Sequence, residues 1–377
     1  MRKPGVEHEA DRHVTGNKIM TTSIGPRTSH LPAPGNVLLW LIAALHVMLV
    51  AALLAALLAA KPATAADQTC TGRNLMLELQ QKDPVRYAEA LKEADATPNG
   101  KGIFWKIEKP GLQPSWLLGS MHVTDPRVLA LPPRAQAAHD AADTIIIESD
   151  EILDERKATA ALLAKPELTM FTDGTTIDKL LSPEDYKRLE AGLKQRGIPL
   201  GAVSRMRPWM ISSAVALPAC EIARKAKGVQ FLDQKIATDA IAQGKQVKGL
   251  ETLAEQIQAM ADLPVEFHLK SLIETLELGD KMSDVVETMT ELYLSGDIGM
   301  TMPMLKTVTP EEEGENSDYA AFEQRIILDR NKVMAERAAP ILDSGNVFMA
   351  VGALHLPGKE GVIELLRQQG FTVTAVN

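Results

Sequence analysis

Hydrophobic and polar positions alternate in the first part of the chain that follows the N-terminal region. Apolar residues occupy every second position of 103–107, and a turn rich in Pro and Gly separates this stretch from a second apolar run at 115–119. This pattern predicts two strands. The next apolar run, 144–147, has no polar break and ends at Glu148, which is typical of a strand that is buried on both faces of a sheet.

The middle of the chain has a helical period instead. Helices are predicted from about 150 to 240 and from 252 to 342, with one strand between them that ends near Glu251. Ser182, which Pro183 follows, is the predicted N-cap of one of these helices. The segment 294–318, which includes the acidic run 311–316, interrupts the second helical block and is predicted to be a mobile loop.

The last 33 residues return to the alternating pattern, with a strand at 346–352, a helix at 360–370 and a strand at 371–376. We therefore expect an α/β fold whose central sheet is built from both ends of the chain, with a large helical insertion at about 152–342. In such sheets ligands bind beyond the carboxyl ends of the strands. If the strands before Glu148 and Glu251 run in the same direction, their carboxylates meet at one edge.

The same short pattern follows two of these strands. Gly119 is followed three residues later by His122, and Gly352 by His355. Two imidazoles and the carboxylate of Glu148 are ligands that suit a divalent metal such as Zn, Mn or Co. A single histidine after a strand is more often a hydrogen-bonding residue, so the repeat in matching strand-to-loop contexts is the evidence.

Other polar residues are weaker candidates. Arg207 and Arg330 are candidates to orient a substrate carboxylate or stabilise an oxyanion, although an ordinary ion pair explains either arginine equally well. His139 and His268 lie in helical stretches and are interpreted as structural. The methionines of the second helical block are candidates for an adaptable apolar wall or for ordinary core packing: Met282, Met289, Met300, Met302 and Met304.

The N-terminal region predicts export. Residues 1–36 have the composition of a disordered leader, and 37–60 is an uncharged apolar run. Ala63 and Ala65 match a signal-peptidase site, which favours a cleaved signal within 37–66, and the apolar run is also long enough for a retained membrane anchor. Both interpretations place the rest of the chain outside the cytoplasm, in the periplasm or anchored at the inner membrane, with membrane contact only through this segment.

Composition narrows the class of protein. The chain has 377 residues, 45% of them hydrophobic, and a formal net charge of −9, which argues against nucleic-acid binding. Its two cysteines, Cys70 and Cys220, permit one disulfide in an oxidising compartment or remain two buried thiols. Neither lies beside a histidine, so a cysteine metal site or nucleophile is not expected.

Several longer motifs resemble the TraB/GumN family, which includes PrgY and the Tiki proteins. They are "SWLLGSMHVTDPRV", "IIIESD", "MRPWM", "FLDQKIATDAIAQGKQVKGLET", "DRN" and "VGALHLPGKEGVIELL", and the resemblance runs over about 68–377. It implies an erythromycin esterase/ChaN-like α/β fold and a metal-dependent, peptidase-like hydrolase. The implied metal ligands are His122, His355 and Glu148, with Arg207 or Arg330 as the functional arginine.

The resulting hypothesis is that a divalent ion activates water for attack on a peptide or other acyl carbonyl. Glu148 or Glu251 would serve as general base and an arginine would stabilise the oxyanion. One alternative is a metal-free esterase-type hydrolase with a His and Glu pair. A second is a periplasmic module that binds a peptide or haem without turnover. The oligomeric state is left open.

Overall fold

The computed structural model describes residues 70–308 and 320–376. The predicted leader (1–36), the signal or anchor segment (37–66) and the acidic run 311–316 lie outside the described residues. The description below therefore concerns the compact unit Ala66–Asn377. None of its described helices is both long and apolar enough to cross a membrane.

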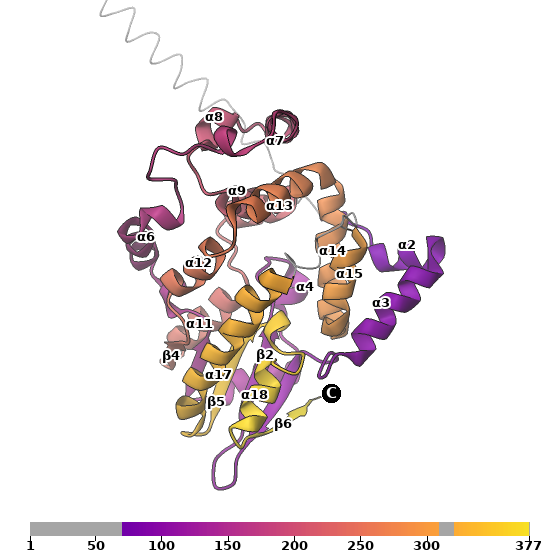
Figure 1. Ribbon diagram of the computed structural model, residues 1–377. Coiled ribbons are helices and arrows are strands. Elements are labelled where there is room, and N and C mark those ends of the chain that lie inside the picture. The colour runs from indigo at the N-terminus through magenta and orange to yellow at the C-terminus, as the bar shows by residue number, and fades with distance from the viewer. Residues whose placement is uncertain (1–69, 309–319, 377) are drawn as a thin grey trace, which may run out of the picture. The chain divides into compact units, whose positions relative to one another are not determined.

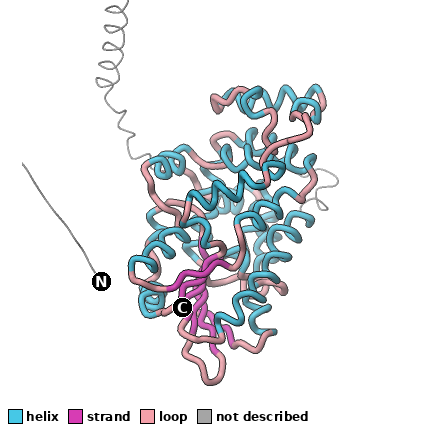
Figure 2. The backbone as a smooth tube through the Cα atoms, turned by 90° about the vertical axis from the view of Figure 1, so that its left-hand side faces the viewer, coloured by secondary structure: helices cyan, strands magenta, loops and turns pink. Residues whose placement is uncertain are grey.

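A six-stranded mixed sheet forms the lower part of this unit in Figure 1 and is drawn in magenta in Figure 2. Its strand order is β4-β3-β5-β2-β1-β6. The first four strands of this order are parallel to their neighbours, whereas β1 is antiparallel to both β2 and β6. The strands are β1 (Phe104–Glu108), β2 (Ser115–Ser120), β3 (Thr144–Ile147), β4 (Gln246–Gly249), β5 (Val347–Gly352) and β6 (Thr372–Ala375).

The predicted sheet from both ends of the chain is therefore observed, with β4 added from within the insertion. The pairing registers bring strand ends together, because Ser120 pairs with Gly352 and Ile147 with Gly249. As a result, β2, β3, β4 and β5 end at the same edge.

Helices cover both faces of the sheet, which explains why β3 and β5 are apolar throughout. Trp105, Ile107 and Met349 pack on one face against α17 (Asp329–Leu342) and α18 (Val362–Gln368), which lie in front of the strands in Figure 1. Phe104 and Phe348 pack on the other face against α5 (Pro133–Ala141) and α11 (Leu232–Ala242).

Most of the insertion forms a helical layer above the sheet edge (Figure 1), with its own apolar core centred on α7, α9 and α13. Ser182 caps α7, as predicted. The helices are α6 (Glu155–Ala164), α7 (Pro183–Gln195), α8 (Leu200–Val203), α9 (Pro208–Val215), α10 (Ala219–Ala226), α12 (Leu253–Ala261), α13 (Val265–Leu278) and α14 (Lys281–Ser295).

The prediction of a mobile loop at 294–318 is wrong for residues 294–308, which the structure describes. A 3₁₀ turn, η4 (Ile298–Met300), and helix α15 (Thr301–Val308) form there, because Met300 and Met304 are buried against the N-terminal helices. The N-terminal helices are α2 (Leu75–Lys82) and α3 (Pro84–Ala96). Shorter elements complete the described chain: α4 (Pro126–Leu129), η1 (Asp150–Leu153), η2 (Pro166–Leu168), η3 (Ile177–Leu180), the π-helical turn η5 (Glu323–Leu328) and η6 (Ala353–His355).

The two cysteines are joined. Cys70 and Cys220 form a disulfide that links the start of the described chain to α10, across 150 positions of sequence. This observation decides between the two interpretations of the cysteines in favour of the disulfide.

Candidate functional site

The carboxyl edge of the parallel strands gathers polar side chains from four separate segments. His122 follows β2, Glu148 follows β3, Glu251 follows β4 and His355 follows β5. Because these strands are parallel, their ends meet at one edge of the sheet. The convergence expected from the sequence is therefore present in the structure.

The glycines of the two repeated motifs allow this close approach. A Cβ atom on Gly119 would lie 3.0 Å from the Cα of Ala353, on the loop that carries His355. A Cβ on Gly352 would lie 3.0 Å from Glu148 Oε1 and 3.3 Å from the His355 ring. Both distances are shorter than ordinary van der Waals contacts, so the absence of a side chain at each position keeps the two loops and the carboxylate together.

Glu148 is the central acid of the site and is 6% exposed. Its Oε1 accepts a hydrogen bond of 2.7 Å from the backbone N–H of Gly352, and its Oε2 accepts one of 2.7 Å from Arg330. Burial opposes ionisation of this carboxyl group. The charges of His355, which is protonated in the acidic range where this carboxyl group titrates, and of His122 and Arg330, together with the Gly352 N–H, outweigh burial and lower the pKa of Glu148 to about 2. Glu148 is therefore an anion at neutral pH.

Arg330, on α17, bridges the two carboxylates. Its NH2 group lies 2.7 Å from both Glu148 Oε2 and Glu251 Oε2, and its Nε donates to Glu251 as well. Its NH1 group donates to the Ile326 carbonyl at 3.4 Å. Because its Nε and NH2 groups bind the two carboxylates, Arg330 is placed to orient Glu148, and the role in oxyanion stabilisation remains a prediction.

His355 is fully enclosed, and its neighbours determine which ring nitrogen carries the proton. Asn331 donates through Nδ2 to the Glu360 carbonyl, so its Oδ1 faces His355 Nδ1 at 2.7 Å and accepts that N–H. Burial outweighs the charge of Glu148 and lowers the pKa of His355 to about 4. The ring is therefore neutral, with the lone pair on Nε2, which lies 3.8 Å from Glu148 Oε1.

His122 has a different environment, with 53% of its side chain exposed. Its Nε2 lies 3.4 Å from Oδ2 of Asp233, a carboxylate on α11 that is 2% exposed. The pocket walls partly desolvate the ring, which lowers its pKa, but Asp233 outweighs this effect and raises the pKa of His122 to about 9. The two motif histidines thus differ in charge at neutral pH.

The structure does not bring Arg207 to this site. Arg207 precedes α9, donates from Nε to the Glu167 carbonyl and lies over the ring of Phe171 at 4.6 Å. Of the two candidate arginines, Arg330 therefore lines the pocket, whereas the contacts of Arg207 are local. His139 and His268 have backbone carbonyl partners, Ile236 and Met260, and are structural as expected.

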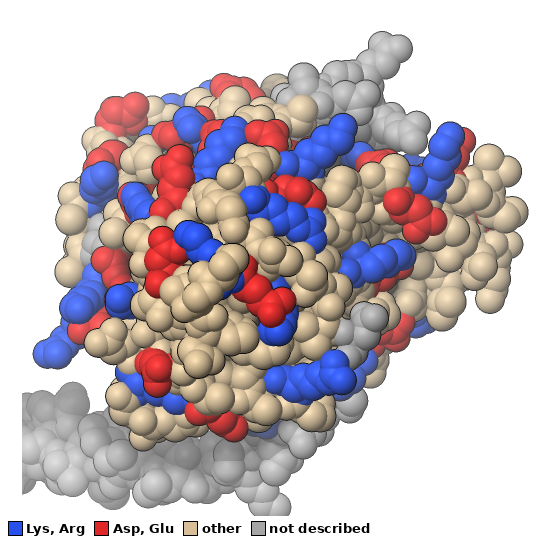
Figure 3. All heavy atoms as spheres, turned by 90° about the horizontal axis from the view of Figure 1, so that it is seen from below, with Lys and Arg blue, Asp and Glu red and all other residues tan. Residues whose placement is uncertain are grey.

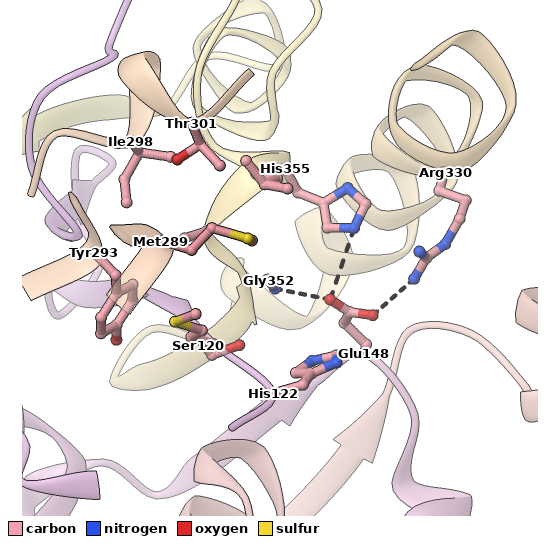
Figure 4. Close-up of a pocket in the computed structure, with 13 residues that line it drawn as sticks. Ser120, His122, Glu148, Met289, Tyr293, Ile298, Thr301, Arg330, Gly352 and His355 are labelled. Carbon is pink, nitrogen blue, oxygen red and sulfur yellow. Dashed lines mark hydrogen bonds and ion pairs between the residues drawn. The ribbon is translucent and has the colours of Figure 1, made fainter. Parts of the chain in front are cut away.

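A pocket of about 330 Å³ opens beside these groups. In Figure 4 the side chains of Glu148, Arg330, His355 and His122 lie on one side, and Met289, Tyr293 and Ile298 lie on the other. Glu251 does not line this pocket. It lines a second cavity of about 340 Å³ on the other side of Arg330, so Glu148 is the better placed of the two candidate bases. The pocket is lined by Ser120, Met121, His122, Glu148, Met289, Tyr293, Ile298, Thr301, Arg330, Gly352, Ala353, Leu354 and His355.

His122, His355 and Glu148 provide the donor atoms for a possible divalent metal ion. Their chemistry fits, because a neutral imidazole oriented through its second nitrogen and an ionised carboxylate are typical ligands. The buried Asp233 Oδ2 accepts no hydrogen bond of good geometry among the described residues, and its ion-pair partner is His122 Nε2 at 3.4 Å. The distances between these side chains do not make a complete metal site. Within residues 70–308 and 320–376, no three His, Cys, Asp or Glu side chains are grouped closely enough to hold an ion.

Asp233 and Asn331 were not predicted from the sequence to belong to the site. Both lie within quoted motifs, "FLDQKIATD" and "DRN", but a polar residue within a helix gives no sign by itself of which loop it will face. Asp233 contacts a histidine 111 positions earlier in the chain, and Asn331 one 24 positions later. Only the packing of α11 and α17 on the sheet creates these pairs.

These features define an α/β protein with a pocket of two histidines and an acid at the carboxyl edge of its sheet. The sequence profile of the TraB/PrgY/gumN family matches residues 103–375, and the chain belongs to this family. No solved structure matches the chain.

Curated relatives are similar over most of the described chain. A protein named Metalloprotease TIKI homolog from Nematostella vectensis is 24% identical over 333 residues, which is 75% of this chain and 69% of that protein. Metalloprotease TIKI2 from Danio rerio is 24% identical over 76% of this chain and 63% of its own length. Uncharacterized protein YbaP from Escherichia coli (strain K12) is 26% identical over 69% of this chain and 90% of its own length. The match thus spans less than two thirds of the zebrafish protein.

Proposed function

We propose that this protein is a hydrolase of peptide or other acyl bonds that acts at the pocket between Glu148, His122 and His355. The observation that carries the proposal is the convergence of these three side chains, from three different strand ends, on one pocket. The TIKI relatives are named metalloproteases, which supports the same class of reaction.

The charges observed in the pocket suit hydrolysis. The ionised carboxylate of Glu148, oriented by Arg330 and Gly352, accepts the proton of an attacking water and returns it to the leaving nitrogen or oxygen. Asn331 holds the ring of His355 with its Nε2 lone pair toward Glu148. The apolar wall excludes bulk water, which strengthens the electrostatic interactions inside the pocket.

A divalent cation, Mn, Co or Zn, would be held by His122, His355 and Glu148. When bound, such an ion polarises the carbonyl and lowers the pKa of a coordinated water. Binding to His122 requires loss of the proton that Asp233 stabilises, so we expect the affinity for metal to rise with pH below about 9.

The test uses the purified full chain, a mixed peptide library and mass spectrometry of the products, with and without Mn, Co or Zn. Glu148→Gln is expected to reduce the rate of cleavage by at least about 100-fold, whereas Glu190→Gln on the exposed side of α7 is expected to leave it unchanged. Absence of cleavage under every metal condition, or full activity in folded Glu148→Gln, would overturn the proposal.

A metal-free hydrolase is the second candidate, because Arg330 already occupies Glu148 and no complete ligand group is present among the described residues. In that case the charged ring of His122 would stabilise the oxyanion and Glu148 would remain the base. Activity that survives a strong chelator, together with a metal content below one ion per ten chains, selects this candidate. Activity that is lost with chelator and restored by Mn, Co or Zn selects the metalloenzyme.

We also propose that the chain is exported, as the predicted segment 37–66 implies. The disulfide between Cys70 and Cys220 supports an oxidising compartment such as the periplasm. The erythromycin esterase/ChaN-like fold implied by the family is likewise a proposal, which the mixed sheet with a helical insertion supports.

A further inference from the structure

The pocket has two chemically different ends. In Figure 4, Glu148, His355 and Arg330 lie at one end, whereas Met289, Tyr293 and Ile298 lie at the other. A substrate whose reacting carbonyl lies beside Glu148 must therefore place a neighbouring group against the second end. The nature of that end determines which substrates fit.

The polar atoms of the second end are largely used within the protein. Tyr293 donates its hydroxyl to the Gly119 carbonyl at 2.8 Å, and Ser120 donates its hydroxyl to Asp233 at 2.7 Å. Thr301 contributes one further, uncharged hydroxyl group. A charged or strongly polar substrate side chain would lose its water here without gaining a partner, which is costly.

The same end offers contacts to an apolar side chain. Met289 and Ile298 lie there in Figure 4, and Met121, Ala353 and Leu354 add further apolar lining to the pocket. Methionine side chains are flexible and polarisable, so they adapt to branched, unbranched and aromatic groups. A cavity of about 330 Å³ is at the small end of ligand pockets, and it holds one side chain and the reacting group, not an extended ligand.

The wall that carries Met289 is held firmly in place. Helix α14 is tied to β2 by the Tyr293 hydrogen bond and to the N-terminal segment by the Arg73–Asp284 ion pair and by a 2.9 Å bond from the Leu75 N–H to the Thr288 hydroxyl. Ile298, on η4, is 3% exposed. The backbone of this wall is therefore preformed and sets the depth of the pocket, whereas the Met289 side chain adjusts to the apolar group that is bound.

We infer that this pocket selects substrates with a large apolar side chain, of the Leu, Met or Phe kind, next to the bond that is cleaved, and that Met289 and Ile298 determine this specificity. The inference rests on the proposed hydrolase function and adds the class of substrate to it.

The test uses matched peptides that differ at one position, X, with X as Leu, Met, Phe, Ala, Ser, Asp or Lys. Cleavage next to X is expected to be at least about tenfold more efficient, in kcat/KM, for Leu, Met and Phe than for Ser, Asp or Lys. Met289→Phe, which fills the pocket, is expected to reduce kcat/KM for X = Phe about tenfold and to reduce it less for X = Ala, so that the preference for Phe over Ala falls. Equal cleavage of apolar and charged peptides would overturn the inference.

Two control variants accompany this test. Leu294→Phe introduces the same residue on the exposed side of α14, where Leu294 is 42% exposed, and is expected to leave the preference for apolar substrates unchanged. If Met289→Phe does not fold, Ile298→Ala provides an independent variant, which should weaken the preference for Leu over Ser. An unchanged preference in a folded pocket variant counts against the inference.

A binding measurement separates this inference from the proposed function. N-acetyl-leucinamide and N-acetyl-serinamide are titrated into folded Glu148→Gln protein and followed by NMR. Tighter binding of the leucine compound, abolished by Met289→Phe, supports the pocket assignment even if no peptide is cleaved, an outcome that overturns the hydrolase proposal alone. Cleavage without apolar preference overturns the pocket assignment alone.

Discussion

Asp233 raises the pKa of His122, so a substitution of Asp233 should change the charge of this ring. Asp233→Asn removes the negative charge 3.4 Å from the ring, so the pKa of His122 should fall from about 9 by about one unit or more toward its ordinary value of 6.5. Titration of the ring protons by NMR measures the change. Asp239→Asn, on an exposed part of the same helix, should leave the His122 titration unchanged. An unchanged pKa in Asp233→Asn would show that the carboxylate does not act on this ring.

The ionised state of Glu148 predicts a dependence of stability on pH. Its pKa is about 2 in the folded protein and 4.5 in its ordinary state, so the ionised form stabilises the fold at pH values above 4.5, and this contribution is lost as the pH falls toward 2. Glu148→Gln should therefore lower the free energy of unfolding at pH 7 by an amount on the order of 3 kcal/mol, and the difference from the wild type should shrink between pH 5 and 3.

Urea unfolding in the presence of a chelator measures this dependence without a contribution from bound metal. Glu190→Gln, at an exposed position, should show no comparable change with pH. A difference between Glu148→Gln and wild type that stays constant from pH 7 to pH 3 would contradict the prediction.

At the scale of elements, the approach of β2 to the loop after β5 depends on Gly119. Gly119→Ala would place a methyl group 3.0 Å from Ala353 Cα and 3.1 Å from Leu356, and the backbone on one side cannot easily move. We expect a loss of about 1–3 kcal/mol in stability and a larger loss of activity, because His122 and His355 would be pushed apart. Thermal unfolding and the peptide assay measure the two effects.

Gly201 provides the matched control for this substitution. It has no atom within 4 Å of an added Cβ, so Gly201→Ala should change neither stability nor activity appreciably. Wild-type activity in Gly119→Ala would show that the spacing of the two loops is not critical.

Local sequence predicted most elements because each one carries its own signal. The cap at Ser182, the uniform apolar run of β3 and the strand β4 within the helical insertion were all recognised and observed. The segment that contains η4 and α15 was misassigned because its Gly, Thr and Pro residues disfavour a helix. Burial of Met300 and Met304 against the N-terminal helices outweighs that preference.

At the scale of the whole molecule, the disulfide closes a loop of 150 positions between the N-terminal segment and α10. The double variant Cys70→Ser/Cys220→Ser should lower the free energy of unfolding by about 2–4 kcal/mol, because the open unfolded chain gains conformational freedom. Urea unfolding with and without reductant measures the effect. Reductant should destabilise the wild type and leave the double variant unchanged, and equal stability of the two proteins would contradict the prediction.

The charge distribution agrees with the composition. On the face seen in Figure 3, Lys and Arg side chains are interspersed with Asp and Glu side chains, as the many ion pairs of the described chain also indicate. A surface on which positive and negative side chains alternate does not create an extended electrostatic field of one sign. The expectation that nucleic acid is not a partner remains a prediction from the net charge of −9.

The sequence by itself determined the elements and their order, because hydrophobic period, caps and turns are properties of neighbouring residues. It also identified His122, His355 and Glu148, since each follows directly on a strand whose end is local information. Only the tertiary structure decided that Arg330 and not Arg207 joins them, that Asp233 and Asn331 orient the two histidines, and that α14 closes one side of the pocket. Those contacts join residues far apart in the chain, and they arise from the packing of helices on a common sheet, for which a linear pattern carries no signal.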